Sequence, residues 1–478
     1  MISQSTNWDL IIVGAGTAGM PCAIAAAEHH AQVVVIEKAS DVGGTLHITG
    51  GHLSAAGTRR QRQRGIDDSP DRHFADVMRI SRGTADPVLV RLAVDEAPRT
   101  LDWLDDLGFP FAPETPALVY GHEPYSVPRT YWGVEAGKSI LATLRPLWDR
   151  YRASGNITLL LEHELIELLW DGQRVVGVVV QGWRGRLKLQ GKAVVLTTGG
   201  YAANPHLFAE VTPGHPRLIS AASPTSTGDG LLAARRLGAA FRNGDKYLPS
   251  LGGLELEPGS GRADWWAAWA LVFSPVYRLP REIYVNERGE RFIAEDEMSP
   301  DRRERALLEQ PGQRFWLVFD DVALHDGPSV VRQWDAAEIR ARAAEGKVVW
   351  SADTLQELAR KAGIDADGLQ QTVKCYNEAV RCGHDPLGRV QLTHPIEKPP
   401  FYALLTYGTS LVSFGGLAVD GRLRVLDEQG NPIPGLYAAG EILGAAATSG
   451  QAFCSGMLLT PSLSFGRWLG RRLAMALR

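Results

Sequence analysis

The segment DLIIVGAGTAG, residues 9–19, decides the fold of this chain. Its first part is a continuous β-prone apolar run, as expected for a parallel strand that is covered on both faces. Gly14, Gly16 and Gly19 follow in a GxGxxG pattern and open an Ala-rich helical stretch. A second apolar run, QVVVIEK, then carries Glu37 near its end. Strand, glycine turn, helix and strand together predict a βαβ unit.

The glycine spacing within this unit predicts a dinucleotide site. Gly14 permits a tight turn, Gly16 lets the backbone approach a diphosphate, and Gly19 allows close packing of the helix. The helix N-terminus adds free N–H groups and the positive end of its dipole. Glu37 ends the second strand, where a carboxylate accepts hydrogen bonds from ribose hydroxyls. These features do not by themselves distinguish FAD from NAD.

The length of 478 residues predicts at least two domains. Apolar strand-like runs return after residue 156, and the composition shifts towards Trp, Glu and Arg after about residue 242. Strands, turns and a final helix follow from about residue 399. We therefore expect a first domain formed by residues 1–242 and 393–478, with residues 243–392 inserted as a second domain.

The bulk composition excludes several classes of partner. The chain has 50 basic and 54 acidic residues, and a formal charge of −4 offers no field for nucleic acid or anionic lipid. Its start has no basic region and no long apolar run, so we expect no signal sequence, no membrane span and a cytoplasmic location. The four cysteines do not suggest a disulfide framework. Cys375, Cys382 and His384 fit no common zinc spacing, so no metal site is predicted.

A family resemblance points to FAD. The run VIEKASDVGGTLHITGGHLSAAG, residues 35–57, resembles the flavin-binding stretch of the fumarate reductase and succinate dehydrogenase flavoprotein superfamily, which also contains 3-ketosteroid dehydrogenases. The resemblance implies an α/β fold, a Rossmann-type FAD-binding domain with an inserted α+β capping domain. Further matches occur in the family's order over nearly the whole chain: VVLTTGGYAAN (194–204), STGDGLLAARRLGA (226–239), NERGERFIAED (286–296), PPFYAL (399–404), FGGLAVDGRLRVLDEQGNPIPGLYAAGE (414–441) and TPSLSFGR (460–467).

The resemblance also implies where FAD lies. Gly43 and Gly44 would lie against the diphosphate, Gly50 and Gly51 beside the isoalloxazine, and Glu441 at the ribityl or ribose region. Substrate would bind at the flavin, between the capping and FAD-binding domains. Together with the glycine motif, it predicts these FAD-binding residues: Gly14, Gly16, Thr17, Ala18, Gly19, Glu37, Lys38, Gly43, Gly44, Thr45, Gly50, Gly51, Leu165, Thr198, Gly199, Asp229, Gly440, Glu441, Gly456, Ser462 and Leu463.

The mode of FAD attachment is expected to be non-covalent. In relatives that bind FAD covalently, a His stands where this chain has Gly44, and His47 is three residues away.

Thr460 and Pro461 predict a helix start, with Thr460 as the N-cap. In the family this helix start points at the flavin N1 and C2 carbonyl, where its dipole stabilises the charge of reduced flavin. Only one GxGxxG is present, so a separate NAD(P)H-binding domain is not expected.

The family's known substrate clamps are altered in this chain. Fumarate reductases hold a dicarboxylate with a His before the GG of the return segment and with an Arg in the C-terminal motif. Here Ser413 and Phe414 precede the GG pair, and Phe453 stands near the expected Arg. A bidentate Arg is hard to replace, so fumarate and succinate are not the expected substrates.

The ketosteroid dehydrogenase pattern is only partly kept. Those enzymes polarise a ketone with a Tyr and a backbone N–H, while a second Tyr removes the α-proton. In this chain Ala452 and Pro300 occupy the places of the two tyrosines, whereas Gly456 retains the backbone position. Other acid–base residues must therefore serve, and steroid specificity is not implied.

The loop GHEPYSVPRTYWG, residues 121–133, offers the best replacement side chains. A Tyr near an Arg can have a lowered pKa and act as a general base, while an Arg can polarise a carbonyl. We predict Tyr125, Arg129, Tyr131 and His52, which follows the second glycine pair, as catalytic residues. The alternatives are a structural lid for the loop and a structural role for His52.

Two features of the expected capping domain have simpler interpretations. Trp265, Trp266 and Trp269 stand at near-helical spacing, which predicts the core of that domain, with a hydrophobic substrate wall or subunit contact as the alternative. Arg302 lies near the family's cap-arginine segment, but Arg303 and Arg305 crowd it, so a solvated charged helix is expected.

The sequence therefore predicts an FAD-dependent oxidoreductase that acts on CH–CH groups. The expected reaction is α,β-dehydrogenation of a small carbonyl compound such as a cyclic ketone or keto acid, with an external electron acceptor that the sequence does not identify. One alternative is an enoate or fumarate-type reductase. Another is a non-catalytic flavin-binding subunit for electron transfer.

Overall fold

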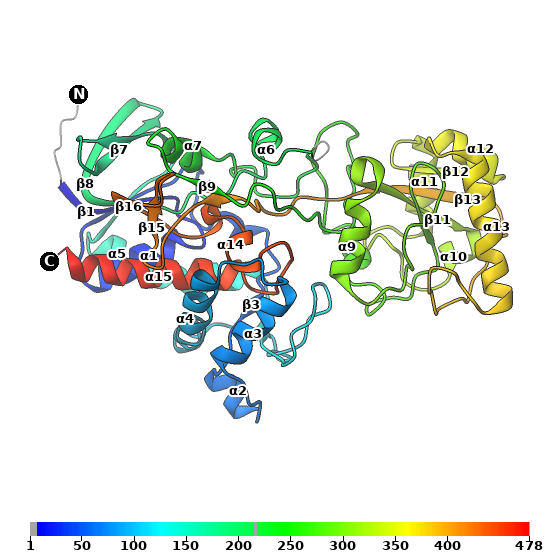
Figure 1. Ribbon diagram of the computed structural model, residues 1–478, viewed down its shortest axis with the longest axis horizontal. Coiled ribbons are helices and arrows are strands. Elements are labelled where there is room, and N and C mark those ends of the chain that lie inside the picture. The colour runs from blue at the N-terminus through cyan, green and yellow to red at the C-terminus, as the bar shows by residue number, and fades with distance from the viewer. Residues whose placement is uncertain (1–6, 215–217, 478) are drawn as a thin grey trace.

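The computed structural model describes residues 7–214 and 218–477. Two lobes lie at opposite ends of an elongated molecule, and extended chain segments run between them (Figure 1). One lobe contains an eight-stranded sheet and both described ends of the chain, and the other contains a four-stranded sheet. A further group of helices projects beside the first lobe. The architecture is mixed α/β, as the sequence predicts.

The eight-stranded sheet forms around β1 (Asn7–Val13), which comes from the opening apolar run. β1 lies between β2 (Val33–Ile36) and β8 (Gly185–Leu196) and pairs with both in parallel. β16 (Pro432–Ala438) pairs in parallel with the other edge of β8, so the C-terminal part of the chain completes this sheet. The other strands are β5 (Ile157–Leu160), β6 (Glu164–Trp170), β7 (Val175–Gly182) and β15 (Arg424–Leu426).

The first and last long helices of this lobe are in direct backbone contact. They are α1 (Gly19–Glu28) and α15 (Leu459–Ala476). A Cβ atom at Gly466 would lie only 2.1 Å from the carbonyl oxygen of Ala18, so only glycine permits this approach. The contact brings the start of α15 to the turn that follows β1.

The predicted cap of α15 is wrong in detail. The helix begins at Leu459, and Leu458 is its N-cap residue. The hydroxyl of Thr460 accepts a hydrogen bond from the backbone N–H of Ser54 at 2.8 Å, instead of capping its own helix. The local sequence predicts that the Thr460 hydroxyl caps its own helix. In the folded protein this hydroxyl instead accepts a hydrogen bond from β3, which is distant in sequence.

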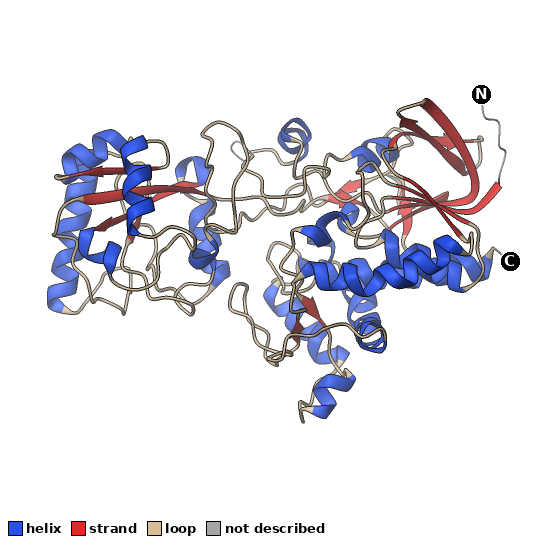
Figure 2. Cartoon of the chain, turned by 180° about the vertical axis from the view of Figure 1, so that it is seen from behind, coloured by secondary structure: helices blue, strands red, loops and turns tan. Residues whose placement is uncertain are grey.

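The second lobe contains an antiparallel sheet with helices around it (Figure 2). The last strand of this sheet, β13, lies beyond residue 392, which the sequence predicts as the end of the capping domain. The chain adds this strand to the sheet before it returns to the first lobe. The sheet order is β10 (Ile283–Val285), β11 (Arg314–Asp320), β13 (Phe401–Tyr407) and β12 (Val349–Ala352). The helices are α8 (Trp269–Val272), α9 (Pro300–Leu308), α10 (Asp321–His325), α11 (Ala336–Glu345), α12 (Leu355–Ala362) and α13 (Ala366–Cys382).

The remaining elements complete the two lobes, connect them or belong to the projecting helical group. A short antiparallel pair, β3 (Leu53–Ser54) and β4 (Thr130–Tyr131), joins the segment after the second glycine pair to the 121–133 loop. The helices are α2 (Arg59–Gln63), α3 (Pro70–Ile80), α4 (Pro87–Asp106), α5 (Gly137–Ala153), α6 (Pro205–Val211), α7 (Asp229–Arg235) and α14 (Ala446–Ser449). Another strand pair is β9 (Phe241–Arg242) with β14 (Gly416–Leu417), and 3-10 turns span Gly44–His47, Pro311–Gln313 and Glu441–Leu443.

Within the described residues, the helices are all too short or too polar to cross a lipid bilayer.

Candidate cofactor and substrate site

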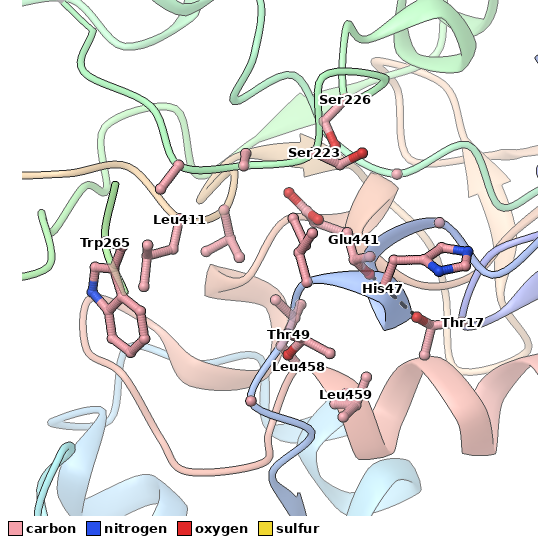
Figure 3. A pocket seen from close by; sticks show the side chains of 18 of the residues that line it. Thr17, His47, Thr49, Ser223, Ser226, Trp265, Leu411, Glu441, Leu458 and Leu459 are labelled. Atoms are coloured by element: carbon pink, nitrogen blue, oxygen red, sulfur yellow. Dashed lines mark hydrogen bonds between the residues drawn. The ribbon is translucent and has the colours of Figure 1, made fainter. Parts of the chain in front are cut away.

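A continuous cavity of about 1740 Å³ runs from the carboxyl ends of the parallel strands towards the second lobe, the one with the four-stranded sheet, which we call the capping lobe. Its wall includes the ends of β1, β2 and β8, the start of α15 and the cap segment that precedes α8. Figure 3 shows Trp265 at one end of the cavity, Thr17 and His47 at the other, and Glu441 between them. Ordinary small-molecule pockets occupy about 300–1,000 Å³. This cavity therefore has room for a dinucleotide and a second small molecule.

Three glycines form a narrow backbone slot after β1. Gly14 has a φ of +102°, and a Cβ atom there would lie 2.3 Å from the carbonyl oxygen of Thr197. Gly16 and Gly44 face each other, because the nearest atom to a Cβ on either one is the Cα of the other, at 4.0 and 3.3 Å. The first turn of α1 lies beside this slot with N–H groups that lack intrahelical acceptors. The slot therefore fits a diphosphate, which any side chain at these positions would displace.

Charged side chains surround the end of the cavity nearest β2. The Glu37 carboxylate accepts N–H groups of Ala15 and Ala39, both at 2.8 Å. A carboxylate has about four acceptor positions, so two remain for ribose hydroxyls. Lys38 forms an ion pair with Asp229 at 2.5 Å across the same end. These contacts position Glu37 at the cavity wall without using up its capacity as an acceptor.

Glu441 lies in the middle of the cavity wall, at the start of a 3-10 turn. Its Oε1 accepts the backbone N–H of Ser413 at 2.9 Å. Burial raises the pKa of this carboxyl to about 7, although the hydrogen bonds from Ser413 act in the opposite direction. A group that donates a hydrogen bond, such as a ribityl or ribose hydroxyl, would offset the cost of its charge.

The structure brings most of the predicted cofactor residues to one cavity. Three do not line it: Gly19 packs against the turn at Gly14, Gly43 donates its N–H to Ala15, and Leu463 is fully buried in the core. Leu463 thus serves helix packing. The predicted residues that line the cavity are Gly14, Gly16, Thr17, Ala18, Glu37, Lys38, Gly44, Thr45, Gly50, Gly51, Leu165, Thr198, Gly199, Asp229, Gly440, Glu441, Gly456 and Ser462.

The predicted catalytic residues separate into two groups. His52 lines the cavity, directly after the second glycine pair. Tyr125, Arg129 and Tyr131 do not line it, and each is buried behind the wall. Hydrogen bonds hold them there: Arg129 with Asp68 and Asp76, Tyr125 with the carbonyl of Ser455, and Tyr131 with Thr58. Their placement does not support an acid–base role in this cavity.

Arg129 is a structural residue in this arrangement. Its guanidinium is fully buried and donates to Asp68 at 2.8 Å and to Asp76 at 2.7 Å. Tyr125 donates its hydroxyl to the carbonyl of Ser455 at 2.5 Å, next to the cavity residue Gly456. Burial raises the pKa of Tyr125 well above its ordinary value. The neighbouring Arg129 lowers it, but by less, so the expected activated tyrosine is not found.

Tyr131 is likewise an internal hydrogen-bonding residue. Its hydroxyl lies 2.6 Å from the hydroxyl of Thr58. Burial raises the pKa of Tyr131 above its ordinary value, and the bond to Thr58 reduces the effect. The tyrosine therefore holds α2 against the β3–β4 pair.

The end of the cavity at the capping lobe is aromatic. Trp265, Trp266 and Trp269 all line it, so they belong to the cavity wall rather than only to the core of the cap. Trp266 is 40% exposed and donates its indole N–H to the carbonyl of Ile48 at 3.2 Å, across the two lobes. Sequence reasoning did not select His122 or Phe273, although near-helical spacing from Trp269 marks Phe273 as a neighbour.

The cap arginines of α9 do not contribute to this wall. Arg302 is exposed and pairs with Glu297 at 3.0 Å, as a solvated helix predicts. Arg303 is buried, and it donates to the carbonyl oxygens of Leu271 and Val272. Arg303 therefore ties α9 to the segment that carries the tryptophans, which a solvated helix does not predict.

Non-covalent attachment of the expected FAD is a first testable prediction. Gly44 offers no nucleophile, and the His47 Nε2 lies 3.0 Å from the carbonyl oxygen of Val42, which occupies that nitrogen. Acid precipitation should therefore leave the yellow colour in the supernatant. A coloured pellet after washing would show a covalent bond.

The ion-pair cluster at Arg129 generates a second prediction. Arg129→Ala leaves Asp68 buried without a counter-charge and Asp76 paired only with the half-exposed Arg79, so it should lower the free energy of unfolding by about 3–5 kcal/mol. The matched control is Arg79→Ala, because Arg79 also contacts Asp76, at 2.9 Å, but is half exposed. Urea unfolding of both variants measures the difference. Equal stability of the two variants would contradict the structural role.

The raised pKa of Glu441 generates a third prediction. The folded-state value of about 7 exceeds the ordinary 4.5, so the folded FAD-depleted protein binds more protons between these values. Its free energy of unfolding should therefore fall as pH rises from about 4.5 to 7. Glu441→Gln removes the charge and should stabilise the protein at pH 8 by about 3 kcal/mol, with little effect at pH 5. The exposed Glu428→Gln is the control; a pH-independent difference for Glu441→Gln would refute the shift.

Comparison with known proteins identifies the family. A family described as "FAD binding domain" matches residues 9–458. The chain is 30% identical over 469 residues to a probable fumarate reductase of Shewanella frigidimarina, covering 98% of this chain and 74% of that protein. It is 27% identical to 4-oxocyclohexanecarboxylate 2-dehydrogenase of Sinomonas cyclohexanicum, covering 98% and 93%.

A solved structure agrees with this fold. The 3-ketosteroid Δ1-dehydrogenase of Sterolibacterium denitrificans superposes with a TM-score of 0.81 at 23% identity, covering 99% of this chain and 100% of that chain. The backbone slot, the cavity and the family match agree on the cofactor. The chain therefore belongs to the FAD binding domain family, and it is an FAD-dependent oxidoreductase of the fumarate reductase and ketosteroid dehydrogenase superfamily.

Proposed function

We propose that this enzyme dehydrogenates the carbon–carbon bond next to the carbonyl of a small cyclic ketone, with or without a carboxylate on its ring. The aromatic wall of the substrate end carries this proposal. Bound FAD supplies the two-electron acceptor. The chain itself must hold the ring, orient its carbonyl and exclude water from the reacting carbons.

Planar rings suit the wall formed by the capping lobe. Trp269 packs against Phe273 with ring centres 4.6 Å apart, and Trp265 is fixed by a hydrogen bond from its indole N–H to Ser250 at 3.0 Å. Phe453 faces the same space from the return segment. Aromatic side chains bind flat apolar surfaces through stacked or edge contacts. A ring is therefore favoured over a short, flexible dicarboxylate.

The positions that clamp carboxylates in fumarate reductases are occupied by other contacts. Ser413 is engaged with Glu441 and Tyr201, and Phe414 is buried. Among the described residues, the arginines that line the cavity are Arg262 and Arg332, and both belong to the capping lobe. Arg332 lies 5.4 Å from the ring centre of Trp269. Arg262 and Arg332 are therefore the arginines of this wall that the carboxylate of a keto acid would use.

The start of α15 supports electron acceptance at this site. Leu458, Leu459 and Ser462 line the cavity, so the first turn of the helix borders the cofactor space. A helix N-terminus favours nearby negative charge by about 0.3–1 kcal/mol. The relation to 4-oxocyclohexanecarboxylate 2-dehydrogenase supports the same direction of reaction. The relation to a probable fumarate reductase keeps reduction of an activated double bond as the second candidate.

Anaerobic mixing distinguishes these candidates and is a fourth prediction. Cyclohexanone and 4-oxocyclohexanecarboxylate should bleach the oxidised flavin, whereas succinate should not. Oxidation of dithionite-reduced enzyme by cyclohex-2-enone, without any bleaching by saturated ketones, would instead identify an enone reductase. An enzyme that responds to none of these compounds but exchanges electrons with redox dyes would identify an electron-transfer subunit.

A further inference from the structure

Two histidines from distant parts of the chain meet at the substrate end of the cavity. His52 follows the Gly50–Gly51 pair, and His122 comes from the 121–133 loop. Their ring centres are 6.5 Å apart, and the ring planes are perpendicular. His52 also lies 5.4 Å from the ring centre of Trp132, and His122 lies 5.7 Å from that of Phe453. The pair is therefore held by aromatic rings.

The polar atoms of these two rings are not used by the protein. No hydrogen bond joins either imidazole to another group in the part of the chain that the structure describes. Nδ1 of His122 is buried without a partner, whereas Nε2 is accessible in the cavity. An N–H at the buried Nδ1 would have no acceptor, which costs more free energy than a bare nitrogen there. We therefore place the proton of the neutral ring on Nε2. His122 thus directs a donor into the cavity.

Both imidazoles are neutral at physiological pH. Burial lowers the pKa of His52 to about 4, and burial together with the nearby His52 lowers the pKa of His122 to about 3. Cys454 also lines the cavity, next to Phe453, which packs on His122. Burial raises the pKa of Cys454 to about 12, so this thiol is neutral as well. A neutral imidazole with so low a pKa is a poor base but a good hydrogen-bond donor.

The spacing of the rings suits a single shared acceptor. An oxygen about 2.9 Å from one nitrogen of each ring would lie roughly 4 Å from each ring centre. The two lines from this oxygen to the ring centres then meet at somewhat more than a right angle, given that the ring centres are 6.5 Å apart. That is the angle between the two lone pairs of a carbonyl oxygen, within the broad range that hydrogen bonds tolerate.

We infer that His52 and His122 form a two-donor site for the carbonyl oxygen of the substrate and for the oxyanion that develops on it. This role rests on the proposed function, because it names the groups that polarise the ketone. It replaces the tyrosine expected from the ketosteroid dehydrogenase pattern. Preorganised donors in a site without bulk water stabilise such an oxyanion strongly.

Titration of the FAD-loaded enzyme with 4-cyanophenol tests this inference without turnover. Its phenolate is a planar oxyanion, as an enolate is. Two neutral donors should lower the pKa of the bound phenol by at least about one unit, which is a tenfold preference for phenolate. Absorbance of the phenolate against pH gives the bound pKa, and calorimetry gives the affinity. An unshifted pKa, or no binding, would overturn the inference.

Variants assign the effect to the two rings. His52→Leu and His122→Leu should each weaken phenolate binding about tenfold, and leave 4-methoxybenzonitrile, which lacks the hydroxyl, nearly unaffected. His52→Gln and His122→Gln should restore part of the loss, because the amide still donates. His73→Leu is the matched control, since His73 is fully buried, has no hydrogen-bond partner on either ring nitrogen among the described residues and does not line the cavity.

The outcomes separate this inference from the proposed function. If both Leu variants bind phenolate like the unmodified enzyme, the two-donor site is refuted even where cyclohexanone bleaches the flavin. If phenolate binding falls in both variants and no ketone or enone reacts, the two-donor site stands and the proposed reaction falls. FAD content and circular dichroism confirm that each variant is folded and loaded.

Discussion

The close approach of two glycine backbones is the constraint on which the rest of this structure depends. Gly16 and Gly44 face each other with no side chain between them, and the turn at Gly14 presses against the chain after β8. A Cβ atom at Gly14 would collide with the carbonyl oxygen of Thr197, whereas Cβ atoms at Gly16 and Gly44 would occupy the space that glycine leaves open to a ligand. The βαβ unit, the 3-10 turn at Gly44–His47 and the start of α1 are all arranged around that space.

The return of the chain after the capping lobe completes the same cavity from the opposite direction. β16 adds to β8 in parallel and delivers Glu441 to the cavity wall. Gly456 lies against β3, where a Cβ atom would be 2.4 Å from the backbone nitrogen of Ser54, and Thr460 in the first turn of α15 accepts the N–H of that same residue. The carboxyl of Glu441 is buried at a cost to stability, which is the expected pattern where a buried polar group serves a ligand.

The substrate end differs from the cofactor end in its chemistry. The cofactor end is lined by charged and polar groups such as Glu37, Lys38 and Asp229, which suit a ribose and a diphosphate. The end at the capping lobe is formed by indoles, phenyl rings and two neutral imidazoles, and charged side chains such as Arg262, Asp264 and Arg332 also line it. The aromatic rings of this wall suit a cyclic substrate, which they can bind through stacked or edge contacts.

The sequence by itself determined the βαβ unit, the glycine slot and the family, because these depend on local patterns such as Gly14 and Gly16 after an apolar strand. It could not determine which side of the 121–133 loop faces the cavity. Arg129 and Tyr125 stand in the same loop as His122, yet their partners, Asp68 and Asp76 for Arg129 and the Ser455 carbonyl for Tyr125, hold them behind the wall that His122 lines. Tertiary structure alone decided this, because burial and partner choice depend on contacts between segments that lie far apart in the chain.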